Sequence, residues 1–202
     1  MALWLAGEPL LLASRSKARQ ALLRAAGVPV EVKPADVDER SLEAAASRAP
    51  PGAIAAVLAR AKASAVATQC PGRLTLGADQ TLALGAACFA KPADMAAARA
   101  QLCELRGQTH ELHSAVAFVR DDQALFEHVG IARLTMRAFS DSFLDCYLEA
   151  VGAAATTSVG GYQIEGPGVQ LFERIEGDYF TVLGLPLLAV LDFLRGDGWL
   201  AS

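Results

Sequence analysis

Apolar residues first cluster at Leu10–Ala13, a short run that the polar triplet Ser14-Arg15-Ser16 ends at once. After this triplet, apolar residues recur at helical spacing as far as Ala25, and Gly27 follows. The pattern therefore predicts a strand that enters a helix through a serine-rich turn. Alternating positions then predict a second strand over Val28–Lys33, and an acidic loop is expected over Pro34–Arg40.

A longer helix is expected after the Pro50-Pro51-Gly52 turn. Its buried face should carry Ile54, Val57, Leu58 and Ala61, with Lys62 at the edge of that face. Two short apolar runs, Leu74–Gly77 and Thr81–Leu84, predict strands, and Asp79-Gln80 should lie in the turn between them.

The second half of the chain predicts three helices, a hairpin and one further strand. The helices are expected over Asp94–Arg106, Ser140–Ala150 and Pro186–Leu194, the hairpin strands over 109–119 and 124–137, and the last strand over Val169–Ile175. This order predicts a mixed α/β fold, a twisted sheet with flanking helices, in a single domain over residues 1–202. Two lobes around a cleft would suit the interruption by the hairpin.

Composition narrows the class of protein. The 202 residues are 53% hydrophobic and carry a net charge of −4, which argues against a general nucleic-acid or anionic-membrane binder. The four cysteines show no metal-binding spacing, so we expect reduced packing residues. Neither a signal-peptide layout nor a membrane-spanning apolar window is present, so a cytoplasmic location is expected.

The serine-rich turn is the first candidate site. Ser14, Ser16 and Arg19 would converge on one phosphate, because a helix start leaves backbone N–H groups free and carries partial positive charge. Alternatively, a serine merely caps the helix and the basic residues are solvated. Asp79 could bind Mg²⁺ or accept a proton from water, although an aspartate in a turn is more often structural.

Other charged residues add weaker signals. Lys62 and Lys91 are isolated cations beside apolar segments and could contact phosphate, although surface lysines are common. The acidic loop offers Asp36, Asp38 and Glu39 as hard oxygen ligands for a divalent cation, or it is simply solvated. His110 and His113 are not expected to share a metal, because positions i and i+3 of a strand face opposite sides.

The segment Gly160–Gly168 is rich in glycine. Its backbone could pass close to a flat ligand, while Gln163 and Glu165 could read hydrogen-bonding edges. A carboxylate matches guanine, because it can accept from both N1–H and the exocyclic amine. An ordinary loop remains the alternative.

The order of these signals along the chain is specific. The chain resembles the Maf family of nucleoside triphosphate pyrophosphatases in the segments LLLASRSKARQALLRAAGV, VDER, LARAKA, LGADQT, KPADMAAARAQLCELRGQTHELHSAVA, GGYQIEGPG and IEGDYFTVLGLPL. The resemblance implies an inosine-triphosphatase-like α/β fold, a homodimer, and cleavage of a nucleoside triphosphate to monophosphate and pyrophosphate with Mg²⁺, Mn²⁺ or Co²⁺.

Residue roles follow from the same resemblance. It places the catalytic carboxylate and proton acceptor at Asp79, and a further acidic position, which would share the metal, at Glu39. Phosphate-contacting positions fall on Ser14, Arg19, Lys62 and Lys91, and we add Ser16 from the turn itself.

The accepted base is less constrained. Gln80 and Glu165 resemble the branch of the family acting on 7-methyl-GTP rather than the dTTP/UTP branch, but Ala18 stands where the former branch has an aromatic residue. GTP, dTTP and UTP therefore stay as alternatives. A protein that binds nucleotide and regulates cell division without catalysis is a competing hypothesis.

Overall fold

The computed structural model describes residues 3–201 and contains one seven-stranded sheet in this part of the chain. The strands are β1 (Leu10–Leu12), β2 (Val30–Val32), β3 (Thr75–Leu84), β4 (Ala87–Phe89), β5 (Thr109–Arg120), β6 (Gln123–Met136) and β7 (Phe172–Glu176). Their order is β2-β1-β3-β5-β6-β7, with β4 also paired to β3. Because β1 runs parallel to β2 and β3 while β3–β4 and β6–β7 are antiparallel, the sheet is mixed, as predicted.

Helices flank this sheet. They are α1 (Lys17–Ala25), α2 (Glu39–Ala45), α3 (Pro51–Ala67), α4 (Met95–Leu105), α5 (Asp141–Val151), α6 (Tyr179–Val182) and α7 (Leu187–Gly196), with 3₁₀ helices η1 (Gly152–Thr156), η2 (Val159–Gly161) and η3 (Pro167–Leu171). The expected α/β architecture with flanking helices is thus confirmed. Within residues 3–201, no helix combines the length and the apolar character needed to cross a membrane.

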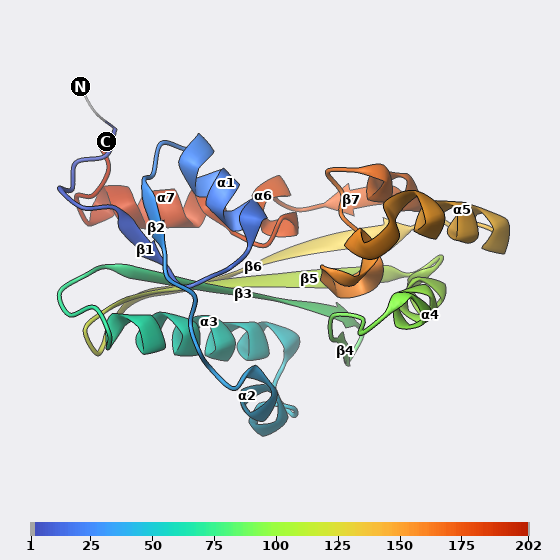
Figure 1. Cartoon of the computed structure of the whole chain (residues 1–202), viewed down its shortest axis with the longest axis horizontal. Helices are drawn as coiled ribbons and strands as arrows, with labels where there is room; N and C mark the ends of the chain where they lie inside the picture. The colour runs from blue at the N-terminus through green and yellow to red at the C-terminus, as the bar shows by residue number, and fades with distance from the viewer. Residues whose placement is uncertain (1–2, 202) are drawn as a thin grey trace. The chain divides into compact units, whose positions relative to one another are not determined.

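The chain divides into two compact units. The first contains the residues up to Gln80, Ser114–Gly130, and the residues from Asp178 onward. In this unit α1 and α7 cover one face of the strands and α3 covers the other (Figure 1). Leucine and phenylalanine side chains fill the first interface, whereas alanines of α3 meet Ala115 and Ala117 of β5 at the second. The helix of small residues therefore lies close to the sheet.

The second unit contains Thr81–His113 and Ile131–Gly177. Here α4 packs against α5, η1 and η2, and the antiparallel pair β6–β7 forms one edge of the sheet. Buried Leu102, Leu105 and Leu134 belong to its core.

Several predicted elements are confirmed with their end signals. Ser16, Asp94 and Ser140 cap α1, α4 and α5, each accepting from the backbone N–H three residues on. Gly27 and Gly107 adopt positive φ after α1 and α4, as expected of helix-terminating glycines. The hairpin also forms, with β5 and β6 adjacent and joined by Asp121-Asp122.

The most important correction concerns Asp79 and Gln80. They do not form a turn, because β3 runs unbroken through both of them. The sequence pattern predicts a strand end at these two polar residues. Instead, Asp79 is paired with Lys62 and Gln80 with Ser114, so neither side chain needs solvent.

Other boundaries also differ. The predicted loop ends in a helix cap, since Asp38 caps α2 and Glu39 begins it. Val57 of α3 is exposed rather than buried. The buried face of α3 consists largely of alanines, to which the prediction from apolar spacing gave too little weight. The strand predicted from Val169 begins only at Phe172, after η3. The packing role expected of all the cysteines is wrong for Cys88 and Cys146, which are exposed.

Candidate active site

A glycine sets the distance between α3 and β3. A Cβ atom on Gly77 would lie 2.1 Å from the carbonyl oxygen of Ala59 and 2.6 Å from the backbone nitrogen of Ala63. The strand backbone therefore lies directly against the helix backbone, and only glycine fits there. Lys62 lies on the same turn of α3, so this close approach carries its side chain to β3 two residues beyond Gly77.

Lys62 bridges two carboxylates. Its Nζ lies 2.7 Å from Oδ1 of Asp79 and 2.8 Å from Oε2 of Glu39. The side chains of Lys62 and Asp79 are each 12% exposed, whereas that of Glu39 is 50% exposed. Strand β3, helix α3 and the first residue of α2 thus supply one cluster with a nearly buried ion pair at its base.

Arg19 of α1 lies beside the same segment of β3, and three hydrogen bonds fix its side chain. Its Nη1 donates to the carbonyl oxygen of Ala78 at 2.8 Å and to Oγ of Ser14 at 3.1 Å, and its Nε donates to the carbonyl oxygen of Gly184 at 2.8 Å. Three of the five N–H donors of the guanidinium are used in these bonds. The remaining two, on Nη2, extend from a side chain whose position is fixed.

The serine-rich turn forms around Arg19. Ser14 is buried, and its Oγ also accepts from the backbone N–H of Ser16 at 3.3 Å. Ser16 caps α1 by accepting from the backbone N–H of Arg19 at 3.3 Å. Ser16 therefore caps the helix, as one of the two interpretations of the sequence predicts. Arg19, however, is not solvated, and the structure brings Ser14, Ser16 and Arg19 together at the start of α1.

Gln80 is bound inside the first unit. Its Nε2 donates to Oγ of Ser114 at 2.9 Å and to the carbonyl oxygens of Thr181 and Val182, both at 3.2 Å. These bonds tie α6 to the residue that follows Asp79. Together with the bond from Arg19 to Gly184, they fix the 181–184 segment beside the cluster.

Charges couple across this cluster. Burial lowers the pKa of Arg19, while the nearby carboxylates of Asp79 and Glu39 oppose that shift. Glu43, one helical turn after Glu39 on α2, has its pKa raised by desolvation and by the charges of Asp79 and Glu39. Sequence reasoning missed Glu43, although its spacing from Glu39 would have identified it had α2 been predicted.

A divalent cation fits the donor set. Mg²⁺ usually takes one or two protein carboxylates and completes its shell with phosphate and water oxygens. Asp79 and Glu39 are two such carboxylates, since both reach the same Lys62 nitrogen. Within residues 3–201 no group of three or more His, Cys, Asp or Glu side chains is placed to hold a metal on its own.

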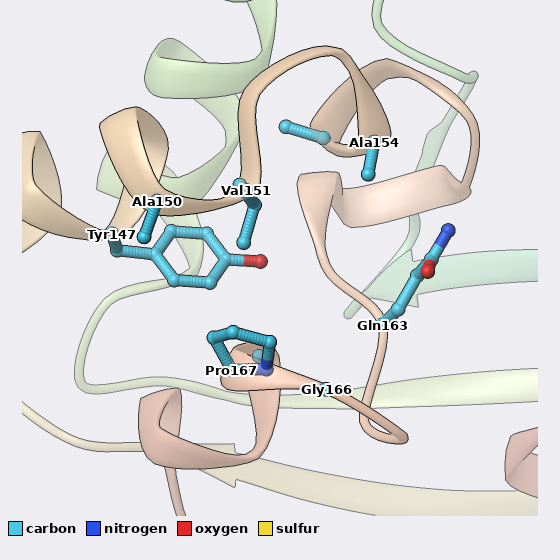
Figure 2. Close-up of a pocket in the computed structure, with 9 residues that line it drawn as sticks. Tyr147, Ala150, Val151, Ala154, Gln163, Gly166 and Pro167 are labelled. Atoms are coloured by element: carbon cyan, nitrogen blue, oxygen red, sulfur yellow. The ribbon is translucent and has the colours of Figure 1, made fainter.

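Two of the predicted site residues belong to the second unit. Lys91 is exposed and lies between β4 and α4, and Glu165 is exposed in the glycine-rich segment. That segment borders a pocket of about 230 Å³, which Tyr147, Val151, Gln163, Pro167 and Gly168 help to line. Figure 2 shows the hydroxyl of Tyr147 directed into this pocket.

The histidines have separate partners. Nε2 of His110 lies 2.7 Å from Oη of Tyr162, whereas Nε2 of His113 lies 2.9 Å from Oε2 of Glu111. Asp38 caps α2 and accepts from Oγ of Ser41 at 2.6 Å, so of the acidic loop only Glu39 pairs with Lys62.

Comparison with known proteins adds a family match. A family model described as "Maf-like protein" matches residues 9–196. A "Nucleoside triphosphate pyrophosphatase" of Rhodopseudomonas palustris strain CGA009 is 58% identical over 201 residues, covering 100% of both chains. A protein of the same name from Bradyrhizobium diazoefficiens is 53% identical, again over 100% of both chains. A "7-methyl-GTP pyrophosphatase" of Mesorhizobium japonicum is 55% identical and covers 95% of this chain and 97% of that protein.

Proposed function

Because the chain belongs to the Maf family, we propose that it is a nucleoside triphosphate pyrophosphatase. It hydrolyses the bond between the α and β phosphates and releases a nucleoside monophosphate and pyrophosphate. The observation that carries the proposal is the Asp79–Lys62–Glu39 cluster with Arg19 fixed beside it. In this cluster a carboxylate lies beside the positively charged side chains of Lys62 and Arg19. The carboxylate can act on the water that attacks phosphorus, and the positive side chains can stabilise the negative charge that builds on the departing group.

In this proposal Asp79 orients the attacking water and accepts its proton. A carboxylate is a weak base, so placement supplies most of the acceleration. That placement comes from the short contact between α3 and β3 at Gly77 and from the bond between Asp79 and Lys62. Lys62 is thus a binding residue and a positioning residue at once.

Positive groups bind the phosphates. Arg19 offers the N–H donors of Nη2, Ser14 and Ser16 shape the start of α1, and Lys62 and Lys91 contribute ammonium groups. Asp79 and Glu39 would hold Mg²⁺, Mn²⁺ or Co²⁺, which when bound offsets phosphate charge.

For the base, we propose a guanine-type nucleotide such as 7-methyl-GTP. Glu165 would accept from the guanine edge, and a 55% identical relative carries the name 7-methyl-GTP pyrophosphatase. Gln80 would contribute by holding α6 through its amide nitrogen. We further propose that the protein is a cytoplasmic homodimer that removes unwanted nucleotides, where the resemblance implies the dimer and the nucleotide role.

The central experiment is a pyrophosphate-release assay over GTP, 7-methyl-GTP, dTTP and UTP with each of the three metals. Asp79→Asn should lower kcat by about 10²–10⁴-fold while nucleotide binding, measured by calorimetry, persists. Asp192→Asn, an exposed residue of α7, is the matched control and should behave as wild type. Undiminished turnover in Asp79→Asn would refute the role of Asp79.

The same assay separates the competing hypothesis. A non-catalytic regulator of cell division would bind nucleotide, yet the wild-type protein would release no pyrophosphate from any substrate. Glu165→Gln tests base recognition: the preference among the four nucleotides should change, and an unaltered preference would remove Glu165 from that role.

A further inference from the structure

A buried polar pair lies in the core of the second unit. His110 on β5 is 0% exposed and Tyr162 is 5% exposed, and a hydrogen bond of 2.7 Å joins His110 Nε2 to Tyr162 Oη. Burial lowers the pKa of His110 to about 4, so the bond joins two neutral groups at neutral pH. Nδ1 of His110 has no partner among the described residues, which makes Tyr162 the one side chain that compensates for the burial of this imidazole.

Aromatic packing fixes the pair in place. Phe172 contacts both rings, with centroid distances of 5.9 Å to His110 and 4.8 Å to Tyr162. Gly160 has a φ of 79°, and a Cβ there would lie 2.7 Å from Cε1 of Tyr162 and 2.6 Å from Cδ1 of Leu82. The chain can therefore place the tyrosine ring here only because the preceding positions are glycine.

Residues 163–168, which we call the glycine loop, follow Tyr162 directly. The loop closes on itself: Gly166 N donates to Gln163 O at 3.4 Å, and a Cβ on Gly168 would lie 2.4 Å from that same oxygen. Glu165 stands exposed in the middle of the loop. Because these contacts close the loop, its position is coupled to that of Tyr162, the residue that precedes it.

The loop is held at both ends: η3, which includes Pro167 and Gly168, packs against α5 and β7, and Oγ of Ser158 donates to the carbonyl oxygen of Tyr162 at 2.6 Å. On one side it borders the pocket of about 230 Å³ rather than packed side chains (Figure 2). Its remaining side-chain bond runs from Gln163 Nε2 to Oγ1 of Thr157, at an exposed position. Residues 163–166 are exposed or half-buried, so the buried Tyr162 anchors them on their N-terminal side.

We infer that the His110–Tyr162 hydrogen bond positions the glycine loop and thereby sets where Glu165 meets the nucleobase. His110 and Tyr162 are positioning residues for base selectivity and do not touch the substrate. The inference rests on the proposed role of Glu165 in base recognition and adds the buried pair that makes that role selective.

Tyr162→Phe is the direct test, because it keeps the ring and removes the hydroxyl. The measured quantity is the ratio of kcat/KM for 7-methyl-GTP to kcat/KM for dTTP. The ratio should fall about fivefold to tenfold, the worth of one buried hydrogen bond, while kcat for dTTP stays within about twofold. Tyr179→Phe, at an exposed ring on α6, is the matched control and should leave the ratio unchanged.

A second variant separates positioning from mere stability. In His110→Leu/Tyr162→Phe neither partner leaves an unpaired polar group, so the melting temperature should recover toward wild type. The selectivity ratio should nevertheless stay low, because the bond that orients the loop is still missing. A ratio that recovers together with stability would overturn the inference, as would a ratio that never changes in either variant.

Glu165→Gln, assayed in parallel, separates base recognition by Glu165 from positioning by the His110–Tyr162 pair. If it changes selectivity while Tyr162→Phe does not, the positioning inference fails and base recognition by Glu165 stands. If neither variant changes selectivity, both ideas fail. Absence of pyrophosphate release by wild type from every nucleotide would overturn the proposed function itself, and the inference with it.

Discussion

Gly77→Ala adds a single methyl group at the contact between α3 and β3, and it tests whether this contact places the catalytic cluster. The added carbon would lie 2.1 Å from the carbonyl oxygen of Ala59 and 2.6 Å from the nitrogen of Ala63, whereas ordinary contacts begin at 3.4 Å. Both neighbours are backbone atoms, so no side chain can rotate away. The helix itself must retreat, by roughly 1 Å.

The retreat has two measurable costs. Overpacking of this kind destabilises by about 1–3 kcal/mol, which in a chain of this size lowers the melting temperature by roughly 3–10 °C. It also moves Lys62 away from Asp79, across a contact that now measures 2.7 Å. A misplacement of about 1 Å can cost on the order of 10²-fold in rate, so kcat should fall more than stability alone explains.

The assay is pyrophosphate release at a temperature where both wild type and variant are fully folded, with thermal melting followed by circular dichroism. Gly196→Ala is the control, because a Cβ at Gly196 of α7 meets nothing within 4 Å; its rate should match wild type, and its melting temperature should be unchanged or slightly higher, since alanine suits a helix better than glycine. A Gly77→Ala protein that is folded and has wild-type kcat would show that the α3–β3 distance does not control the cluster.

Two further predictions concern stability. The pKa of His110 is lowered from 6.5 to about 4 by burial; the unfolded chain therefore binds the proton first, and stability present above pH 6.5 should decline by up to about 3 kcal/mol as the pH falls to 4. Urea titrations across this range should show a shallower decline for His110→Leu/Tyr162→Phe, and an equal slope would contradict the assignment. Phe118→Ala should cost about 3–5 kcal/mol, since Phe118 is 0% exposed and its ring centroid lies 4.4 Å from that of Phe193; a loss below about 1 kcal/mol in the same titration would mean that the core repacks.

The sequence predicted helix ends well because capping is local. Ser16, Asp94 and Ser140 each bind a backbone N–H three residues away, and such a bond depends on no distant segment. The unbroken strand at Asp79 could not be predicted in the same way. The side chain of Asp79 is tolerated inside the strand only because Lys62 of α3 pairs with it. The residues around Asp79 in the sequence give no indication of that contact.

The candidate site likewise combines features that local sequence predicts with contacts between distant segments that it does not predict. Residue types identified Asp79, Arg19 and Lys62 one at a time, but their grouping depends on the close approach at Gly77. The sequence associates Gln80 with base selection, whereas in the structure its amide nitrogen is bound to Ser114 and to α6. Those partners lie far along the chain, and short-range patterns carry no information about them.

The alanine interface between α3 and β5 also limits how this protein can change over evolutionary time. Ala55, Ala59, Ala63 and Ala67 face Ala115 and Ala117, and all six are essentially inaccessible to solvent. Side chains of one carbon leave no larger group to trim, so nearly every mutation there inserts bulk. Sequence drift should therefore accumulate on the leucine-rich face, where one large residue can be exchanged for another, and stabilising designs have more freedom beside α1 and α7 than beneath α3.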